Sequence, residues 1–224
     1  MEKYRHPFRR YIALGDSISI DEYPLRETGI PNIGAASLLY EALAPIEFEN
    51  LAADGATTED VLRFQLPLVA RSNVETLVTL TAGGNDMLMY LGAIFPPRDL
   101  VGGMIERITR IVDELIAKLP NGLILLGTVY DPSDGTNTLD GQRFDREAGW
   151  LARYNEAVRG IAAVGGGATL LADIHARFLG HGVTAPIEDR YYWSGLIFEP
   201  NAKGAREVAN LWMEADFTSP LHIG

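Results

Sequence analysis

Residues 101–129 read VGGMIERITRIVDELIAKLPNGLILLGTV, and this stretch decides the fold class. In its first part, apolar residues recur at alternating steps of three and four, which predicts a helix from Val101 to Leu119 with one apolar face. Pro120-Asn121-Gly122 ends that helix, and Leu123–Val129 is a continuous apolar run. An amphipathic helix followed by a fully apolar strand is typical of a parallel sheet, whose strands are buried on both faces.

The same alternation continues on both sides of this stretch, without a repeat, a low-complexity tract or a linker. We therefore expect a single α/β domain over residues 1–224, built on a five-stranded parallel sheet. The expected strands are Tyr11–Leu14, Ile46–Leu51, Leu77–Thr81, Leu123–Val129 and Thr169–Ala172. The other expected helices are Ala35–Leu43, a short one capped by Thr57 or Thr58 and running toward Pro67, Glu147–Val164 and Ala202–Met213.

Composition narrows the possible partners. The net charge is −11 and there is no basic run, so we expect neither nucleic acid nor an anionic membrane surface as a partner. The absence of cysteine excludes thiol chemistry, and no His or Asp cluster has metal-ligand spacing. We expect no metal and no cofactor. The first residues, MEKYRHPFRR, lack the apolar core of a signal peptide, so the expected location is cytoplasmic.

Polar motifs follow the first three expected strands: Gly15-Asp16-Ser17, Asp54-Gly55 and Gly84-Asn85-Asp86. In a parallel sheet the ligand crevice lies at the carboxyl ends of the strands, so these turns converge. Ser17 could expose its hydroxyl there as a nucleophile. The N–H groups of Ser17 and Gly55 and the Asn85 amide could then stabilise an oxyanion. Each motif alone is an ordinary turn, and only their joint placement indicates acyl transfer.

The segments ALGDSIS, NLAADGAT, TAGGNDM and EPNAKG, in this order, resemble blocks one, two, three and five of the SGNH (GDSL) hydrolase superfamily. The resemblance implies a three-layer α/β/α flavodoxin-like sandwich and a serine esterase or acylhydrolase that acts on a small-molecule ester. It assigns Ser17 as nucleophile and oxyanion donor, and Gly55 and Asn85 as the other two donors. Asp16 is expected to be structural.

Block five of that superfamily usually reads Asp-x-x-His-Pro, but here Glu199 stands at the histidine and Leu196 at the aspartate. Three interpretations stay open. Glu199 could be an N-cap of the last helix, because Pro200 fits a first helical position. It could be the general base, with a pKa raised by burial. His181, or less readily His175, could serve as the base instead. If the base is lost, the alternative function is a non-catalytic ligand-binding module.

Two further segments are weaker signals. Residues 131–137, DPSDGTN, are rich in oxygen ligands but do not match a calcium loop, and we expect a solvated loop. Tyr191-Tyr192-Trp193 could line an acyl or sugar pocket, although such aromatic clusters are more often packing.

Overall fold

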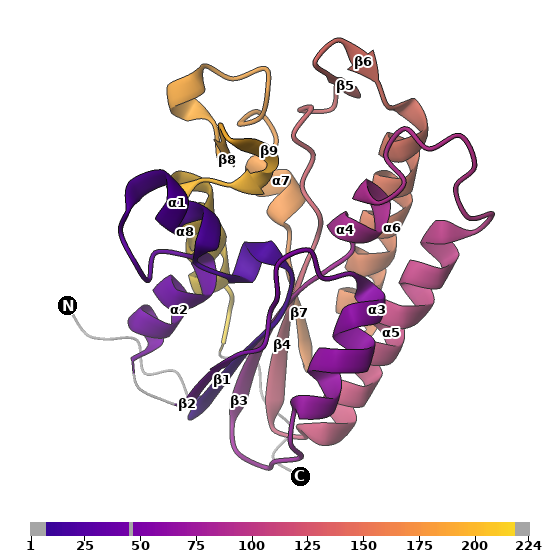
Figure 1. Cartoon of the computed structure of the whole chain (residues 1–224). Helices are drawn as coiled ribbons and strands as arrows, with labels where there is room; N and C mark the ends of the chain where they lie inside the picture. The colour runs from indigo at the N-terminus through magenta and orange to yellow at the C-terminus, as the bar shows by residue number, and fades with distance from the viewer. Residues whose placement is uncertain (1–7, 45–46, 218–224) are drawn as a thin grey trace.

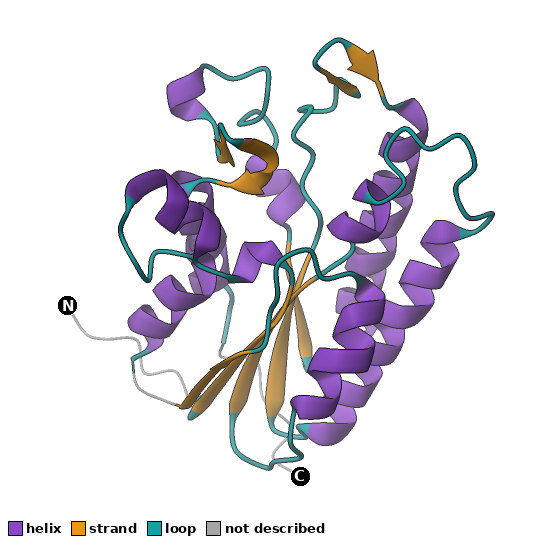
Figure 2. Cartoon of the chain, viewed as in Figure 1, coloured by secondary structure: helices purple, strands orange, loops and turns teal. Residues whose placement is uncertain are grey.

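The computed structural model describes residues 8–44 and 47–217. Its central feature is a parallel five-stranded sheet in the order β2-β1-β3-β4-β7 (Figures 1 and 2). The strands are β1 (Arg10–Gly15), β2 (Glu47–Asn50), β3 (Thr76–Thr81), β4 (Gly122–Gly127) and β7 (Thr169–Ala172). The expected parallel five-stranded sheet is confirmed.

The three central strands are buried along their whole length, because helices cover both faces of the sheet. Strand β2 differs. Its sequence is EFEN, and every residue is partly or fully exposed because it lies at the sheet edge and pairs only with β1. The expectation that the strands are buried on both faces is therefore wrong for β2. An edge strand has one face and one side open to water and tolerates charge there.

Helices form a layer on each face of the sheet, as Figure 1 shows. On one face the apolar core joins alternate residues of β1, β3 and β4 to α5 and α6, and on the other it joins the remaining residues to α2, α7 and α8. The architecture is the expected three-layer α/β/α sandwich. The helices are α1 (Glu22–Thr28), α2 (Ala35–Leu43), α3 (Thr58–Asp60), α4 (Gly84–Leu88), α5 (Leu100–Lys118), α6 (Asp145–Val164), α7 (Ile174–Phe178) and α8 (Ala202–Met213).

The short helix after β2 is capped by Thr57, one of the two residues expected there. Its side chain accepts from the Asp60 N–H, while the Asp60 carboxylate accepts from the Thr57 N–H. The segment continues as a π-helical turn, η2 (Val61–Gln65), and a 3₁₀ turn, η3 (Leu66–Leu68), which contains Pro67. The chain thus stays helical over the expected range, in three different helix types.

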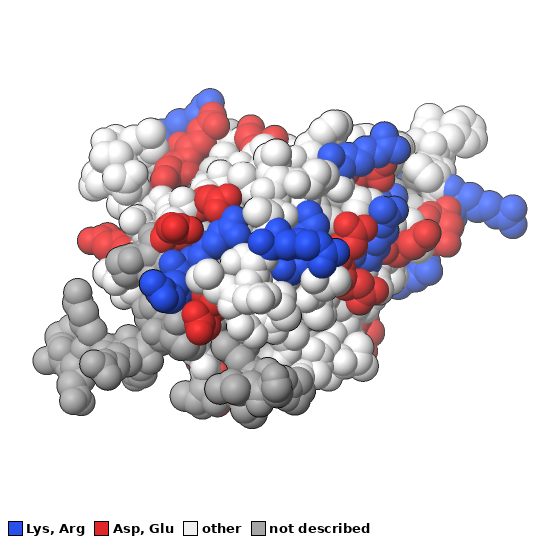
Figure 3. All heavy atoms as spheres, turned by 90° about the horizontal axis from the view of Figure 1, so that it is seen from below, with Lys and Arg blue, Asp and Glu red and all other residues white. Residues whose placement is uncertain are grey.

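Smaller elements stand above the carboxyl edge of the sheet (Figure 1). They are two hairpins and two 3₁₀ turns: β5 (Thr138–Leu139) with β6 (Gln142–Arg143), β8 (Tyr192–Trp193) with β9 (Leu196–Pro200), η1 (Ser17–Ser19) and η4 (Ile187–Asp189). The opposite end of the molecule carries acidic and basic side chains close to one another (Figure 3). Within residues 8–44 and 47–217, no helix combines the length and apolarity needed to cross a bilayer.

Candidate active site

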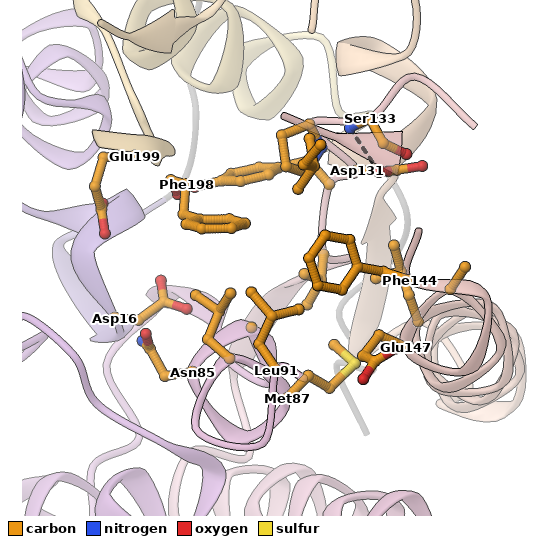
Figure 4. Close-up of a pocket in the computed structure, with 18 of the residues that line it drawn as sticks. Asp16, Asn85, Met87, Leu91, Asp131, Ser133, Phe144, Glu147, Phe198 and Glu199 are labelled. Carbon is orange, nitrogen blue, oxygen red and sulfur yellow. Dashed lines mark hydrogen bonds between the residues drawn. The ribbon is translucent and has the colours of Figure 1, made fainter. Parts of the chain in front are cut away.

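A pocket opens at the carboxyl edge of the sheet, between the β8–β9 hairpin and helices α4 and α6. Ser17, Asn85 and Glu199 all line it. In Figure 4 the carboxyls of Asp16 and Glu199 lie with Asn85 at one end, and Phe144 lies toward the other. The structure therefore brings together the candidate nucleophile, one oxyanion donor and the candidate base, from three distant parts of the chain.

Ser17 sits at the sharp turn from β1 into η1 and is 5% exposed. The turn depends on Gly15, whose φ is +123° and whose added Cβ would lie 1.7 Å from the Thr81 carbonyl oxygen. The Gln65 side-chain amide accepts from the Gly15 N–H (2.7 Å) and donates to the Gly15 carbonyl (2.8 Å). A fixed backbone thus places the Ser17 hydroxyl at the pocket wall.

Asp16 holds the same turn together. Its Oδ1 accepts from the Ile18 N–H (3.2 Å) and from the Thr81 hydroxyl (3.0 Å), and it is the N-cap of η1. Burial raises the pKa of the Asp16 carboxyl to about 7, although these hydrogen bonds oppose the shift. The contacts fit the structural role expected for Asp16.

Asn85 lies in the first turn of α4, and its Nδ2 donates to the Ala56 carbonyl (3.1 Å). That bond ties the turn after β3 to the turn that contains Gly55. Gly55 has φ +70°, which favours glycine, and no atom lies within 4 Å of an added Cβ. Gly55 does not line the pocket of Ser17 but a neighbouring hollow with Asp54 and Ala56. Its role as an oxyanion donor stays a prediction.

Asp86, next to Asn85, links the turn after β3 to the start of α3. Its buried carboxylate accepts from the Thr58 N–H (2.8 Å) and hydroxyl (2.6 Å) and from the Arg107 guanidinium (3.1 Å). The Arg107 Nε also donates to the Thr58 hydroxyl (2.7 Å). Sequence reasoning placed Asp86 only in the turn after a strand, because its partner Arg107 from α5 is visible only in three dimensions.

Glu199 lies in β9 and not at the start of the last helix. The N-cap of α8 is Asn201, whose side-chain oxygen accepts from the Gly204 N–H (2.8 Å). The interpretation of Glu199 as N-cap is therefore wrong, although the expected bounds of the helix, Ala202–Met213, are confirmed. Asparagine is among the strongest N-cap residues, so Glu199 has no capping duty.

Strand β9 packs beside η1, and this contact brings Glu199 to Ser17. The Tyr130 hydroxyl fixes the strand one residue earlier by donating to the Phe198 carbonyl (2.5 Å). Glu199 is 6% exposed, and among the described residues its Oε2 has no hydrogen-bond partner. A buried carboxyl oxygen without a partner is costly and is one mark of a functional site.

The electrostatic surroundings of Glu199 hold the proton on its carboxyl. Burial raises its pKa to about 8, and the negative charges of Asp16, Asp54 and Glu22 add to the shift. A hydrogen bond with the Ser17 side chain acts in the opposite direction and lowers the pKa. One member of this acidic group, Asp54, has a partner, because its Oδ1 accepts from the Tyr23 hydroxyl (3.0 Å).

Neither candidate histidine lines the pocket. His181 stacks on the Tyr191 ring with centroids 3.9 Å apart, and its Nδ1 lies 3.0 Å from the Asp189 carbonyl oxygen. The backbone N–H of His175 donates to the Thr128 hydroxyl. These contacts fit structural roles, and the geometry favours Glu199 over either histidine.

The segment 131–137 does not form a solvated loop, because four of its residues line the pocket and Ser133 is 3% exposed. Asp134 binds it to the segment after α7 by accepting from the N–H groups of Gly180, Gly182 and Thr184. Tyr191 and Tyr192 pack on Phe178 and do not line the pocket, in agreement with the packing interpretation.

Sequence reasoning missed the apolar wall of the pocket. Most of its side chains come from α4, the turn after it, the β5–β6 hairpin and α6, and they are Met87, Leu88, Leu91, Leu139, Phe144, Ala148 and Leu151. No motif marks these residues, since they are ordinary apolar positions of separate elements. Among the described residues, no group of three His, Cys, Asp or Glu side chains is placed to hold a metal ion.

Residues 13–207 match the model of a protein family described as the GDSL-like lipase/acylhydrolase family. No curated protein sequence matches the chain.

Solved structures share the fold along almost the entire chain. A lipolytic protein of the G-D-S-L family from Veillonella parvula is 19% identical, with a TM-score of 0.67, over 93% of this chain and 98% of that one. Phospholipase A1 from Streptomyces albidoflavus is 21% identical, with a TM-score of 0.65, over 91% and 98%. A catalytic mutant of an acetylxylan esterase from Geobacillus stearothermophilus is 18% identical, with a TM-score of 0.67, over 95% of each chain.

Proposed function

This chain belongs to the GDSL-like lipase/acylhydrolase family, and we propose that it hydrolyses a small carboxylic ester through an acyl-serine intermediate. The observation that carries the proposal is that Ser17 and the buried Glu199 carboxyl line the same pocket, with Glu199 near enough for the Ser17 side chain to lower its pKa. A nucleophile close to a base, beside an amide donor, is the arrangement that acyl transfer requires.

In the first half-reaction the Glu199 carboxylate takes the Ser17 proton while Oγ attacks the ester carbonyl. The Asn85 amide, with the N–H groups of Ser17 and Gly55, stabilises the negative oxygen of the tetrahedral intermediate. The C–O bond to the alcohol then breaks, and the Glu199 carboxyl returns its proton to the leaving oxygen. In the second half-reaction the carboxylate deprotonates a water molecule, which attacks the acyl carbon. The C–O bond to Ser17 then breaks, the Glu199 carboxyl returns the proton to Ser17 Oγ, and the acid is released.

A glutamate can replace histidine here because the site raises its basicity. An ordinary glutamate, with a pKa near 4.5, is a weak base for a serine hydroxyl, whereas a pKa of about 8 lies close to a physiological working pH. Glutamate also has no tautomer to fix, so it needs no aspartate to orient it. The exposed Leu196 at the aspartate position of the motif agrees with that difference.

The experiment compares the wild type with Ser17→Ala and Glu199→Gln. We expect labelling by a fluorophosphonate probe and hydrolysis of a p-nitrophenyl ester, both absent in Ser17→Ala. In Glu199→Gln the kcat should fall by about 10²–10⁴, the usual contribution of a general base. His181→Ala is the matched control and should retain its kcat/KM. If the wild type neither labels nor turns over any ester, the protein is a non-catalytic ligand-binding module instead.

A further inference from the structure

The pocket beside Ser17 is polar at one end and apolar at the other. Figure 4 places Asp16, Asn85 and Glu199 at the polar end, and Leu91, Met87 and Phe144 away from Glu199. The apolar end also includes Leu139, Ala148 and Leu151. Ala148 and Leu151 lie three residues apart on one face of α6, and Phe144 is the residue immediately before that helix.

The carboxylates that border the apolar end are already paired. Glu147 accepts from the Arg146 guanidinium (2.6 Å) and the Gly92 N–H (3.3 Å), and its pKa is held below the ordinary value. Asp131 accepts from the N–H groups of Ser133 (2.8 Å) and Gly135 (2.9 Å). Because these partners belong to the protein itself, the apolar end fits an uncharged aliphatic group and not an ion.

The direction of the reaction decides which part of the ester enters this end. Glu199 must return a proton to the leaving alcohol, so the alcohol oxygen lies on the Glu199 side of the reacting carbon. The acyl chain then points away from Glu199, toward Leu91 and Phe144 (Figure 4). A single methyl group cannot contact α4, the hairpin and the first turns of α6 at once.

We propose that this apolar end is an acyl-chain pocket, and that the ester carries an aliphatic acyl group of medium length, such as octanoyl, in preference to acetyl. The inference rests on the proposed function for the direction of the chain. Each methylene that the pocket removes from water is worth about a fourfold gain in kcat/KM. Two buried methylenes therefore raise kcat/KM more than tenfold.

The experiment measures kcat/KM for p-nitrophenyl acetate and p-nitrophenyl octanoate, below the solubility limit of the octanoate. We expect the octanoate-to-acetate ratio to exceed ten in the wild type. Ala148→Phe fills the apolar end and should lower that ratio at least tenfold. Ala152→Phe, which places the same ring on an exposed position of α6, is the matched control and should keep the ratio. Leu139→Trp, on the hairpin, is a second blocking variant if Ala148→Phe does not fold.

A ratio below one in the wild type, or a ratio that both blocking variants leave unchanged, overturns the acyl-chain pocket while the esterase proposal stands. A binding measurement on Ser17→Ala identifies the other case, in which the acyl-chain pocket exists but the protein hydrolyses no ester. Titration calorimetry with octanamide and acetamide, neither of which needs turnover, should show at least tenfold tighter binding of octanamide, lost in Ser17→Ala/Ala148→Phe. If no ester is hydrolysed but this difference is found, only the proposed function fails. Equal affinities for the two amides overturn the pocket.

Discussion

Replacing Glu199 with glutamine tests whether the fold holds a proton on this carboxyl. The structure raises the pKa of Glu199 from 4.5 to about 8, so the folded state binds the proton more tightly than the unfolded chain does. Glu199 therefore makes folding less favourable as the pH rises from 4.5 to about 8. At low pH both states are protonated, so Glu199 does not change the free energy of unfolding there. Glutamine keeps the shape and carries no charge at any pH.

The size of the effect follows from the two pKa values. With 1.36 kcal/mol per unit, ionisation of Glu199 costs about 0.8 kcal/mol at pH 5 and about 4.7 kcal/mol at pH 9. The free energy of unfolding of Glu199→Gln relative to the wild type should therefore increase by about 4 kcal/mol between these pH values. The other carboxyls, including Asp16, titrate in both proteins, so most of their contribution cancels in the difference.

Urea denaturation at pH 5 and pH 9, followed by far-UV circular dichroism, measures the difference. Glu188→Gln replaces an exposed glutamate and is the matched control, expected within about 0.5 kcal/mol of the wild type at both pH values. If Glu199→Gln differs from the wild type by the same amount at pH 5 and pH 9, the proton is not held and the reasoning about the base is wrong. If Glu199→Gln is more stable than the wild type at pH 9 and has a lower kcat, the proposed general base is also the group that destabilises the fold at alkaline pH.

Three other predictions follow from the same geometry. Because Glu199 must be ionised to act as base, kcat/KM should rise about tenfold between pH 7 and pH 9, and a flat pH profile over that range would contradict the assignment. Asn85→Ala should lower kcat by about 10²–10³ in the p-nitrophenyl ester assay, and a loss of less than threefold would remove Asn85 from the oxyanion site. Gly15→Ala forces a Cβ against the Thr81 carbonyl and should lower the free energy of unfolding by about 3 kcal/mol or more in urea denaturation, whereas a change below 1 kcal/mol would show that the turn can relax.

The sheet could be predicted from the sequence because its central strands are mostly apolar and are buried along their entire length. Leu123–Val129 and Leu77–Thr81 are buried between two helix layers, so a continuous apolar run was the right signal. The candidate turns that contain Ser17 and Asn85 could be placed for a related reason: parallel strands end at one edge of the sheet, so these two turns line one pocket. Strand β2 shows where this reasoning fails, since an edge strand with alternating glutamates carries no such run.

The apolar part of the pocket could not be predicted, because its side chains come from elements whose contact is decided by tertiary packing. Phe144 precedes α6 in a polar segment, and Leu139 lies in a two-residue strand. Residues 131–137 have the composition of a solvated loop, yet the hydrogen bonds of Asp134 to the 180–184 segment hold them against the pocket. Such long-range hydrogen bonds leave no local trace in composition.

Glu199 shows how a local rule can be correct and still misassign a residue. The sequence Glu-Pro-Asn precedes a helix, and both the glutamate and the asparagine are polar residues next to a proline. Asparagine outranks glutamate as an N-cap, and Asn201 closes the helix on Gly204, so the capping role was already filled two residues later. What remains is a buried carboxyl with a raised pKa, beside a serine hydroxyl and with one oxygen that no described residue satisfies. Such a group lowers the stability of the fold, and the proposed role in moving the Ser17 proton accounts for a carboxyl at this position.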